Sequence, residues 1–227
     1  MKGLVQYIEE RYVNAHTTED IKKLVEKYGD EMMDIINYGY RDIGGCSGIS
    51  VKEDIPTKAD FAKLYRKDGK IVAVALYADK RHPNKGMDIY LSDRTKNRGR
   101  KLVAVAASEG NSAYLKKILT EDFARMERNV WGEFSSKAAT FALRCGALPI
   151  PVDAAEAIMD PKKFYAKKED GYFYTRKIGD KLHTKVMMGN HLFYKHSIDK
   201  KMTKEDIEKF KALGKKYAIE DDKLNHM

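Results

Sequence analysis

Cysteine, tryptophan and long apolar runs are all scarce in this chain. Its 227 residues include two cysteines and one tryptophan. Cys46 and Cys145 lie far apart and outside any metal-ligand spacing, so the sequence favours a reduced chain with two thiols over a disulfide. No apolar run is long enough to cross a bilayer, and residues 1–16 lack the apolar core of a secretion signal. We therefore expect a cytoplasmic protein.

Internal repeats, low-complexity segments and metal-binding patterns are absent as well. The six histidines have no spacing typical of a metal site, so no metal is expected. Positive charge, in contrast, is in excess, with a formal net charge of +9. A basic balance of this size favours anionic partners such as nucleic acid or a phosphorylated cofactor, although it is also compatible with a role in solubility alone.

Hydrophobic periodicity predicts helices in the first part of the chain. Apolar residues recur at helical spacing over 3–13, 18–28 and 30–40, and a Thr17-x-x-Asp20 start signal precedes the second of these segments. The Gly-rich stretch RDIGGCSGI, residues 41–49, is predicted to be a loop. Two strands are predicted next, at 61–67 and 71–78, joined by the hairpin signal Asp68-Gly69.

The rest of the chain alternates between strand and helix patterns. Apolar or β-favouring runs at 102–107 and 129–134 flank an amphipathic helix at 112–127, and a second helix ends near Gly146. A closing hairpin and a C-terminal helix beginning at Thr203-x-x-Asp206 follow. A strand–helix–strand unit over 102–134 is predicted to be a right-handed parallel crossover. The expected fold class is therefore α/β (α+β): a mixed sheet with a central parallel strand pair and flanking helices.

This succession of elements resembles the GNAT (Gcn5-related N-acetyltransferase) superfamily. Three local matches support the resemblance: KLVAVAAS followed by NSAYLKKI, then NVWGEFS, then ATFALRCGALPIP. It implies a GNAT-like domain over about residues 18–190. A helical extension at 1–17 and a helical tail at 191–227 would be additions to that domain.

The resemblance also implies a CoA-type donor, acetyl-CoA or another acyl-CoA, and an amine-bearing acceptor. Backbone N–H groups between the strand at 102–107 and the following helix would hold the donor phosphates. The cofactor-binding residues implied are Ala107, Ser108, Gly110, Asn111, Ser112 and Ala113. Family members usually carry further glycines in this loop, whereas here it reads SEGNSA, with a negative charge at Glu109. Ala142 stands where the family often has a tyrosine that acts as general acid.

The end of the strand at 129–134 supplies two candidates for catalysis. Glu133 is expected to be either a general base or an ordinary strand residue at the surface. Ser135 is expected to donate a hydrogen bond to the reacting groups or to cap the next helix. His183, in the closing hairpin, is expected on the acceptor side, although a lone histidine often has no particular role.

The loop at 41–49 is the candidate acceptor-binding segment, with an ordinary loop of tight turns as the alternative. Arg41 would bind an anion, Asp42 would act as a base, and Gly44 and Gly45 would allow close approach of the acceptor.

A basic segment at 80–101 leads into the strand at 102–107. Arg94, Lys96, Arg98 and Arg100 are candidates for contacts with nucleic acid, unless this is only a solvated loop. The alternative function is therefore a nucleic-acid-directed protein on the same fold, either a base modifier, as in a DNA-modifying branch of the superfamily, or a non-catalytic binder. A structural or inhibitory protein that has lost the cofactor is a third possibility.

Overall fold

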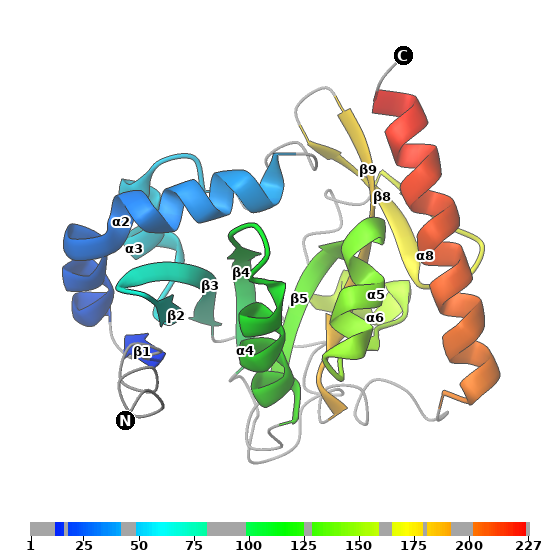
Figure 1. Ribbon diagram of the computed structural model, residues 1–227. Coiled ribbons are helices and arrows are strands. Elements are labelled where there is room, and N and C mark those ends of the chain that lie inside the picture. Colours follow the sequence, from blue (N-terminus) through cyan, green and yellow to red (C-terminus); the bar gives the residue numbers. More distant parts are fainter. Residues whose placement is uncertain are drawn as a thin grey trace. The chain divides into compact units, whose positions relative to one another are not determined.

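The computed structural model describes most of the chain, and the chain divides into two compact units (Figure 1). The described residues are 12–15, 18–41, 49–80, 99–124, 129–158, 165–178, 181–191 and 202–225. Unit 1 comprises residues 1–79 and 100–119, and unit 2 comprises residues 80–99 and 120–227.

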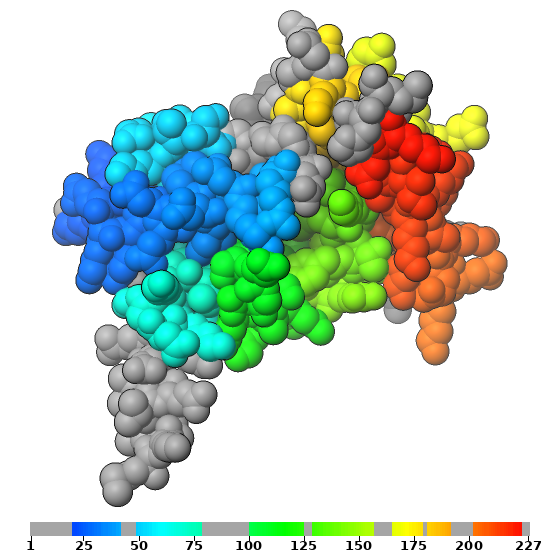
Figure 2. Space-filling model, turned by 45° about the horizontal axis from the view of Figure 1, so that its top comes forward, coloured from blue at the N-terminus to red at the C-terminus, as the bar shows by residue number. Residues whose placement is uncertain are grey.

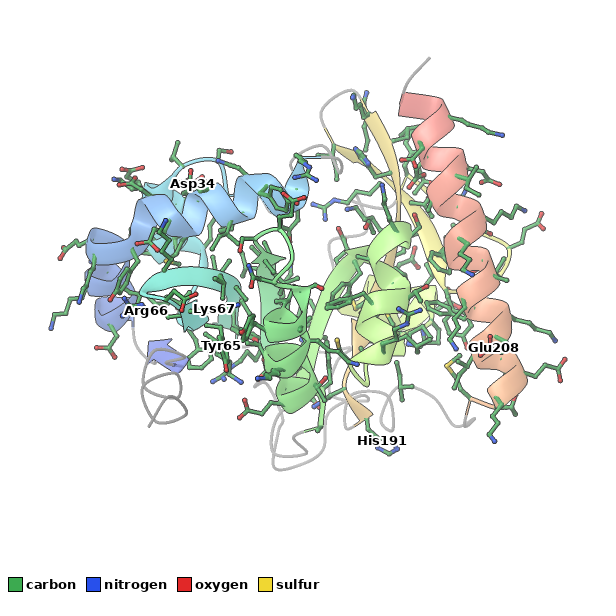
Figure 3. All side chains as sticks on the ribbon, viewed as in Figure 1. Asp34, Tyr65, Arg66, Lys67, His191 and Glu208 are labelled. Atoms are coloured by element: carbon green, nitrogen blue, oxygen red, sulfur yellow. The ribbon has the colours of Figure 1, made fainter. Side chains whose placement is uncertain are left out.

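Unit 1 is built on a sheet covered by a long helix. Its strands follow the order β1 (Tyr12–Ala15), β2 (Phe61–Lys67), β3 (Lys70–Lys80) and β4 (Gly99–Ala107), with β1–β2 and β2–β3 antiparallel. Its helices are α2 (Thr18–Tyr40), the 3-10 helix η1 (Lys52–Asp54), α3 (Ile55–Lys58) and the first part of α4 (Ser112–Ala124). Figure 2 shows α2 and the segment 49–60 side by side at the surface of this unit.

The beginning of unit 1 differs from the sequence expectation. Tyr12 and Val13, at the end of the predicted helix 3–13, lie in strand β1 and pair with Tyr65 and Leu64 of β2. The prediction was wrong for these two residues, because a backbone ladder along a sheet edge outweighs a weak local helical pattern. Residues 1–11 lie outside the described part of the chain.

One continuous helix, α2, replaces the two helices expected at 18–28 and 30–40. Gly29 within it is buried, and a helix-interior glycine costs only about 1 kcal/mol relative to alanine. Apolar residues on both sides of it, Ile21, Met32 and Ile36 among them, enter one core with Leu64 and Val74 of the sheet. Each buried side chain of this size contributes roughly 1.5–3 kcal/mol, so packing outweighs the cost of Gly29 within the helix.

The C-terminal part of α2 lies very close to β4. A Cβ atom at Gly39 would stand 2.7 Å from the Cβ of Ala106 and 3.5 Å from its Cα. Such a separation is shorter than any ordinary carbon–carbon contact. Glycine at 39 and alanine at 106 therefore determine how closely the helix approaches the strand.

We expect Gly39→Ala to lower the free energy of unfolding by about 1–3 kcal/mol, because it overpacks this contact. The matched control is Gly29→Ala in the same helix, where the new Cβ would meet the side chains of Lys52 and Val25 at 3.1 Å. Since the Lys52 side chain is flexible, this change should stay within about 1 kcal/mol of the parent. Urea unfolding measures both. The prediction is wrong if Gly39→Ala is as stable as the parent, or if adding Ala106→Gly to Gly39→Ala does not restore the lost stability.

Unit 2 is a second group of strands with helices on one face. Its strand order is β5 (Asn129–Ser135), β9 (Lys181–Gly189), β8 (Phe173–Ile178) and β7 (Ala166–Lys167), and these neighbours are antiparallel. The short strand β6 (Leu148–Pro149) also pairs with β9. The helices are α5 (Ser136–Arg144), α6 (Val152–Ile158) and α8 (Lys204–Asn225), together with the last part of α4.

Helices α5 and α8 lie side by side in unit 2, and α8 also contacts strand β9 (Figure 1). The ring of Phe210 stacks on Phe173 with 5.0 Å between centroids. The Tyr217 hydroxyl donates to Asp170 Oδ2 at 2.7 Å, and both burial and this carboxylate raise the tyrosine's pKa well above its ordinary value. The predicted start of α8 is confirmed, because Thr203 and Asp206 exchange capping hydrogen bonds.

A carboxylate near the C-terminal end of α8 ties the helix to α5 and β9. Asp221 Oδ2 accepts from the Thr184 amide at 2.8 Å and from Ser136 Oγ at 3.3 Å, while Oδ1 accepts from Thr184 Oγ1 at 2.7 Å. Thr184 and Ser136 are both buried. The carboxylate thus satisfies three buried donors that have left water.

The expected fold class is confirmed: the chain is a mixed α/β protein whose sheet is flanked by helices. The segments 102–107 and 129–134 are both strands, β4 in unit 1 and β5 in unit 2, and their parallel pairing stays a prediction, as do the domain limits 1–17, 18–190 and 191–227. None of the described helices is both long and apolar enough to cross a membrane.

Candidate functional site

The connection between β4 and α4 in unit 1 is a short, well-anchored turn. The Ser108 amide donates to the Val72 carbonyl of β3 at 3.0 Å, and the Asn111 amide donates to the Ser108 carbonyl at 3.1 Å. The Asn111 side-chain amide donates to Ser108 Oγ and to the Glu109 carbonyl, each at 3.0 Å. Gly110 has a φ of +73°, a conformation that favours glycine, and no atom lies within 4 Å of where its Cβ would be.

This turn leaves the first amides of α4 accessible. The Tyr114 amide donates to the Asn111 carbonyl at 3.1 Å, whereas the amides of Ser112 and Ala113 have no acceptor among the described residues. Asn111 directs its side-chain amide back into the turn, so that group closes the loop. Ser112 and Ala113 are exposed, as are Glu109 and Gly110. The result is an accessible helix N-terminus with free donors, to which the helix dipole adds partial positive charge.

A side chain of α2 contacts the backbone of β4 close to this turn. The Val105 amide donates to the Tyr40 hydroxyl at 3.1 Å. Arg41 follows directly; it is exposed, and its guanidinium carbon lies 3.8 Å from the centroid of the Tyr38 ring. The other acceptor-site candidates of this loop, Asp42, Gly44 and Gly45, lie outside the described residues.

Of the basic candidates for nucleic-acid contacts, only Arg100 lies in the described part of the chain. Its guanidinium carbon lies 4.1 Å from the Phe61 ring centroid and 5.8 Å from that of Tyr77. Both rings are buried, so this cation packs on the core of unit 1. Arg94, Lys96 and Arg98 are outside the described residues.

In unit 2, Glu133 is engaged by two other side chains. Its Oε1 accepts from Arg176 Nη1 at 2.6 Å, and its Oε2 accepts from the Tyr174 hydroxyl at 2.9 Å. The Glu133 side chain is only 11% exposed. Burial and the adjacent carboxylate raise the pKa of Tyr174 well above its ordinary value, so the phenol stays protonated and keeps donating to Glu133. Glu133 stands out in the sequence because it lies near the end of a strand, whereas the two residues that hold it do not stand out.

The other two candidates of unit 2 differ in their surroundings. Ser135 is the N-cap of α5, and its Oγ accepts from the Ala138 amide at 3.2 Å, which is the structural alternative that the sequence analysis left open. His183 is 6% exposed, and its Nε2 has no hydrogen-bond partner among the described residues. Burial, followed by the charge of Lys185, lowers its pKa, so the imidazole is neutral at neutral pH. No group of three or more potential metal ligands gathers in the described part of the chain.

No protein-family model matches this chain, and no curated protein matches it. Solved structures resemble it in outline. An acyl-CoA N-acyltransferase from Pseudomonas aeruginosa is 12% identical, with a TM-score of 0.44 over 80% of this chain and 99% of the other. A Bacillus subtilis acetyltransferase in complex with CoA is 10% identical, with a TM-score of 0.43 over 80% of this chain and 97% of the other.

Along the chain, a helix precedes the antiparallel strands β2 and β3, and then β4, α4, β5, α5 and the hairpin β8–β9 follow in turn. This is the order of elements that the sequence predicts, and the chain has a mixed α/β fold.

Proposed function

We propose that this protein is a GNAT-like transferase that moves an acyl group from a CoA-type donor to an amine-bearing acceptor. The observation that carries the proposal is the β4–α4 connection. It combines exposed, unpartnered amides at Ser112 and Ala113 with an open approach over Gly110, whose Cβ position has nothing within 4 Å. Free N–H donors at the start of a helix suit an anion, and the open space over the glycine would let a phosphate approach them.

The residues of this turn fit the phosphates of a CoA-type donor. Backbone N–H groups bind phosphate oxygens without regard to side-chain identity, so the loss of the family's other glycines leaves two donors in place. Glu109 opposes binding, but it is exposed, and an exposed charge acts by about 1 kcal/mol or less. We therefore propose a working but weakened phosphate site made by Ala107, Ser108, Gly110, Asn111, Ser112 and Ala113.

As the acceptor nitrogen bonds to the acyl carbon of a CoA thioester, the C–S bond breaks, CoA leaves as a thiolate, and the nitrogen must lose a proton. Among the described residues we propose Glu133 for that proton. Each carboxylate oxygen can accept more than one hydrogen bond, so Glu133 keeps free acceptor capacity beside Arg176 and Tyr174. Ser135, Asp42, Arg41, Gly44 and Gly45 remain proposed contributors to catalysis or acceptor binding. The cytoplasmic location also remains a proposal.

Calorimetric titration with CoA tests the phosphate site directly. Ser112→Pro removes one amide donor at the first helical position, where proline is compatible with a helix, and should weaken CoA binding by about tenfold. Gly110→Val should weaken binding too, because a β-branched side chain resists a φ of +73° and crowds the approach. Glu109→Gln should tighten binding by a few-fold, since it removes a repelling charge.

Glu53→Gln is the charge-matched control, because Glu53 is an exposed carboxylate of η1 in the same unit. It should leave CoA affinity unchanged. If the parent binds no CoA, or if Ser112→Pro, Gly110→Val and Glu109→Gln all bind as the parent does, the β4–α4 connection is a plain turn and the transferase proposal loses its support.

The nucleic-acid alternative has no comparable observation in its favour. Arg100 packs on buried aromatic rings, and the other three basic candidates lie outside the described residues. We therefore propose the transferase alone.

A further inference from the structure

The strands of unit 2 gather polar side chains on one face. In the β5–β9 register Ser135 lies opposite Lys185, and in the β8–β9 register Tyr174 lies opposite Lys185 and Arg176 opposite His183. Because side chains alternate along a strand, these residues share a face with Glu133. The other face carries Phe173 and Thr184, which contact Phe210 and Asp221 of α8. The polar strand face is therefore the one turned away from α8. Besides the buried Met187, it carries Glu133, Ser135, Tyr174, Arg176, His183 and Lys185.

This polar strand face is buried. Tyr174 is 0% exposed, Lys185 2%, His183 6% and Ser135 8%. Buried lysine and histidine side chains are costly to a fold unless they are paired, because their polar groups have left water. A face of this composition is thus not explained by packing, and each polar group on it needs a partner.

Four of the six side chains have one. Glu133 binds Arg176 and Tyr174, and Ser135 caps α5. The remaining two, His183 and Lys185, stand two residues apart on β9. His183 Nε2 is buried without a hydrogen-bond partner. The Lys185 side chain is only 2% exposed, and no carboxylate of a described residue forms an ion pair with its ammonium. One face thus carries a buried donor and a cation, two positions apart, without an acceptor from the described residues.

The charges of the polar strand face indicate what that group is. Lys185 and Arg176 are cations, Glu133 is an anion that Arg176 already binds, and His183 is neutral. One positive charge, on Lys185, is left uncompensated. A carboxylate or phosphate oxygen would accept from the Lys185 ammonium and from a protonated Nε2 of neutral His183 at once.

We propose that Lys185 and His183 form a subsite for an anionic group on the acceptor. The acceptor of this transferase would then be an amine that also carries a carboxylate or phosphate, with the anion at Lys185 and the amine toward Glu133. This inference depends on the proposed function, because the protein has an acceptor only if it is a transferase. The anion-binding property itself belongs to unit 2 and needs no donor.

The test is an NMR titration of the full chain, without CoA, with three matched amines. Butylamine has no acid group, 4-aminobutyrate has a carboxylate at similar length, and 3-aminopropyl phosphate has a phosphate. The parent should bind at least one anionic amine about tenfold more tightly than butylamine, the size of one charge-assisted hydrogen bond. The tighter of the two identifies the anion, and the ring signals of His183 should shift as that ligand is added.

Lys185→Met should abolish the preference for the anionic amine while keeping a side chain of similar length. Lys177→Met is the matched control: it removes the same charge from an exposed position on the neighbouring strand β8, and should keep the preference. The inference is overturned if all three amines bind equally, if none of them binds, or if the preference survives in Lys185→Met. A chain that prefers the anionic amine but binds no CoA would keep the subsite and lose the proposed transferase.

Discussion

Asp221→Ala is expected to lower the free energy of unfolding by about 3–5 kcal/mol. The change removes the acceptor of three donors: the Thr184 amide, Thr184 Oγ1 and Ser136 Oγ. Thr184 and Ser136 are 2% and 1% exposed, so water cannot replace the lost carboxylate without opening the contact with α8. Each buried donor left unsatisfied costs about 1–3 kcal/mol.

Asp222→Ala is the control for this experiment. Asp222 is the next residue of α8 and is exposed, so its removal should change the free energy of unfolding by less than about 0.5 kcal/mol. Urea unfolding, followed by circular dichroism, measures both variants. An Asp221→Ala protein as stable as Asp222→Ala would show that the hydrogen bonds of Asp221 contribute little to holding α8.

Glu133→Ala is expected to cost a similar amount, about 3–5 kcal/mol, because it breaks a largely buried ion pair and leaves its partners behind. Arg176 would lose a contact of 2.6 Å, and the hydroxyl of the fully buried Tyr174 would lose an acceptor at 2.9 Å. Glu133→Gln keeps an oxygen for Tyr174 and should cost less.

A double-mutant cycle separates the interaction energy between Glu133 and Arg176 from the contributions of their other contacts. If the loss arises from an unpaired arginine, Glu133→Leu combined with Arg176→Met should be more stable than Glu133→Leu alone. Additive losses would mean that the two side chains do not interact in solution. Measured by urea unfolding, the cycle gives the coupling energy without any knowledge of the acceptor.

The contacts of Glu133 also matter for the proposed catalysis. Glu133 is held in place from two sides, so the same contacts that stabilise unit 2 position the carboxylate that we propose as proton acceptor. Glu133→Gln is the variant of choice for activity, since it removes the proton acceptor while keeping the hydrogen bond to Tyr174. A general base typically contributes two to four orders of magnitude in rate.

Most of the predicted elements are present because their signals are local. The strands at 61–67 and 71–78 and the closing hairpin at 172–188 follow from short runs of alternating or apolar residues beside turn signals. The end of α5 follows from Gly146, whose φ of +91° is one that favours glycine. Where the prediction failed, at Tyr12, Val13 and the interior of α2, contacts with distant residues outweighed the local pattern.

The candidate site was only partly predictable, for the same reason. The turn at Ser108–Asn111 and the carboxylate of Glu133 stand out in the sequence, since each ends a strand. Arg176, Tyr174 and Lys185 do not, because nothing in the sequence specifies which hairpin residue faces which strand. Glu133 and Arg176 are 43 residues apart and meet only once β8, β9 and β5 have paired.

The sequence by itself therefore determined most of the helices and strands, the fold class, and the strand-to-helix turn that we propose as the phosphate site. These follow from hydrophobic periodicity and turn residues, which act over a few neighbours along the chain. Only the tertiary structure decided the partners of Glu133, the hydrogen bonds of Asp221, the role of Ser135 as a helix cap, and the placement of Lys185 and His183 on one face. Each depends on strand register or helix docking, where a shift of one residue along a strand would turn every side chain to the opposite face.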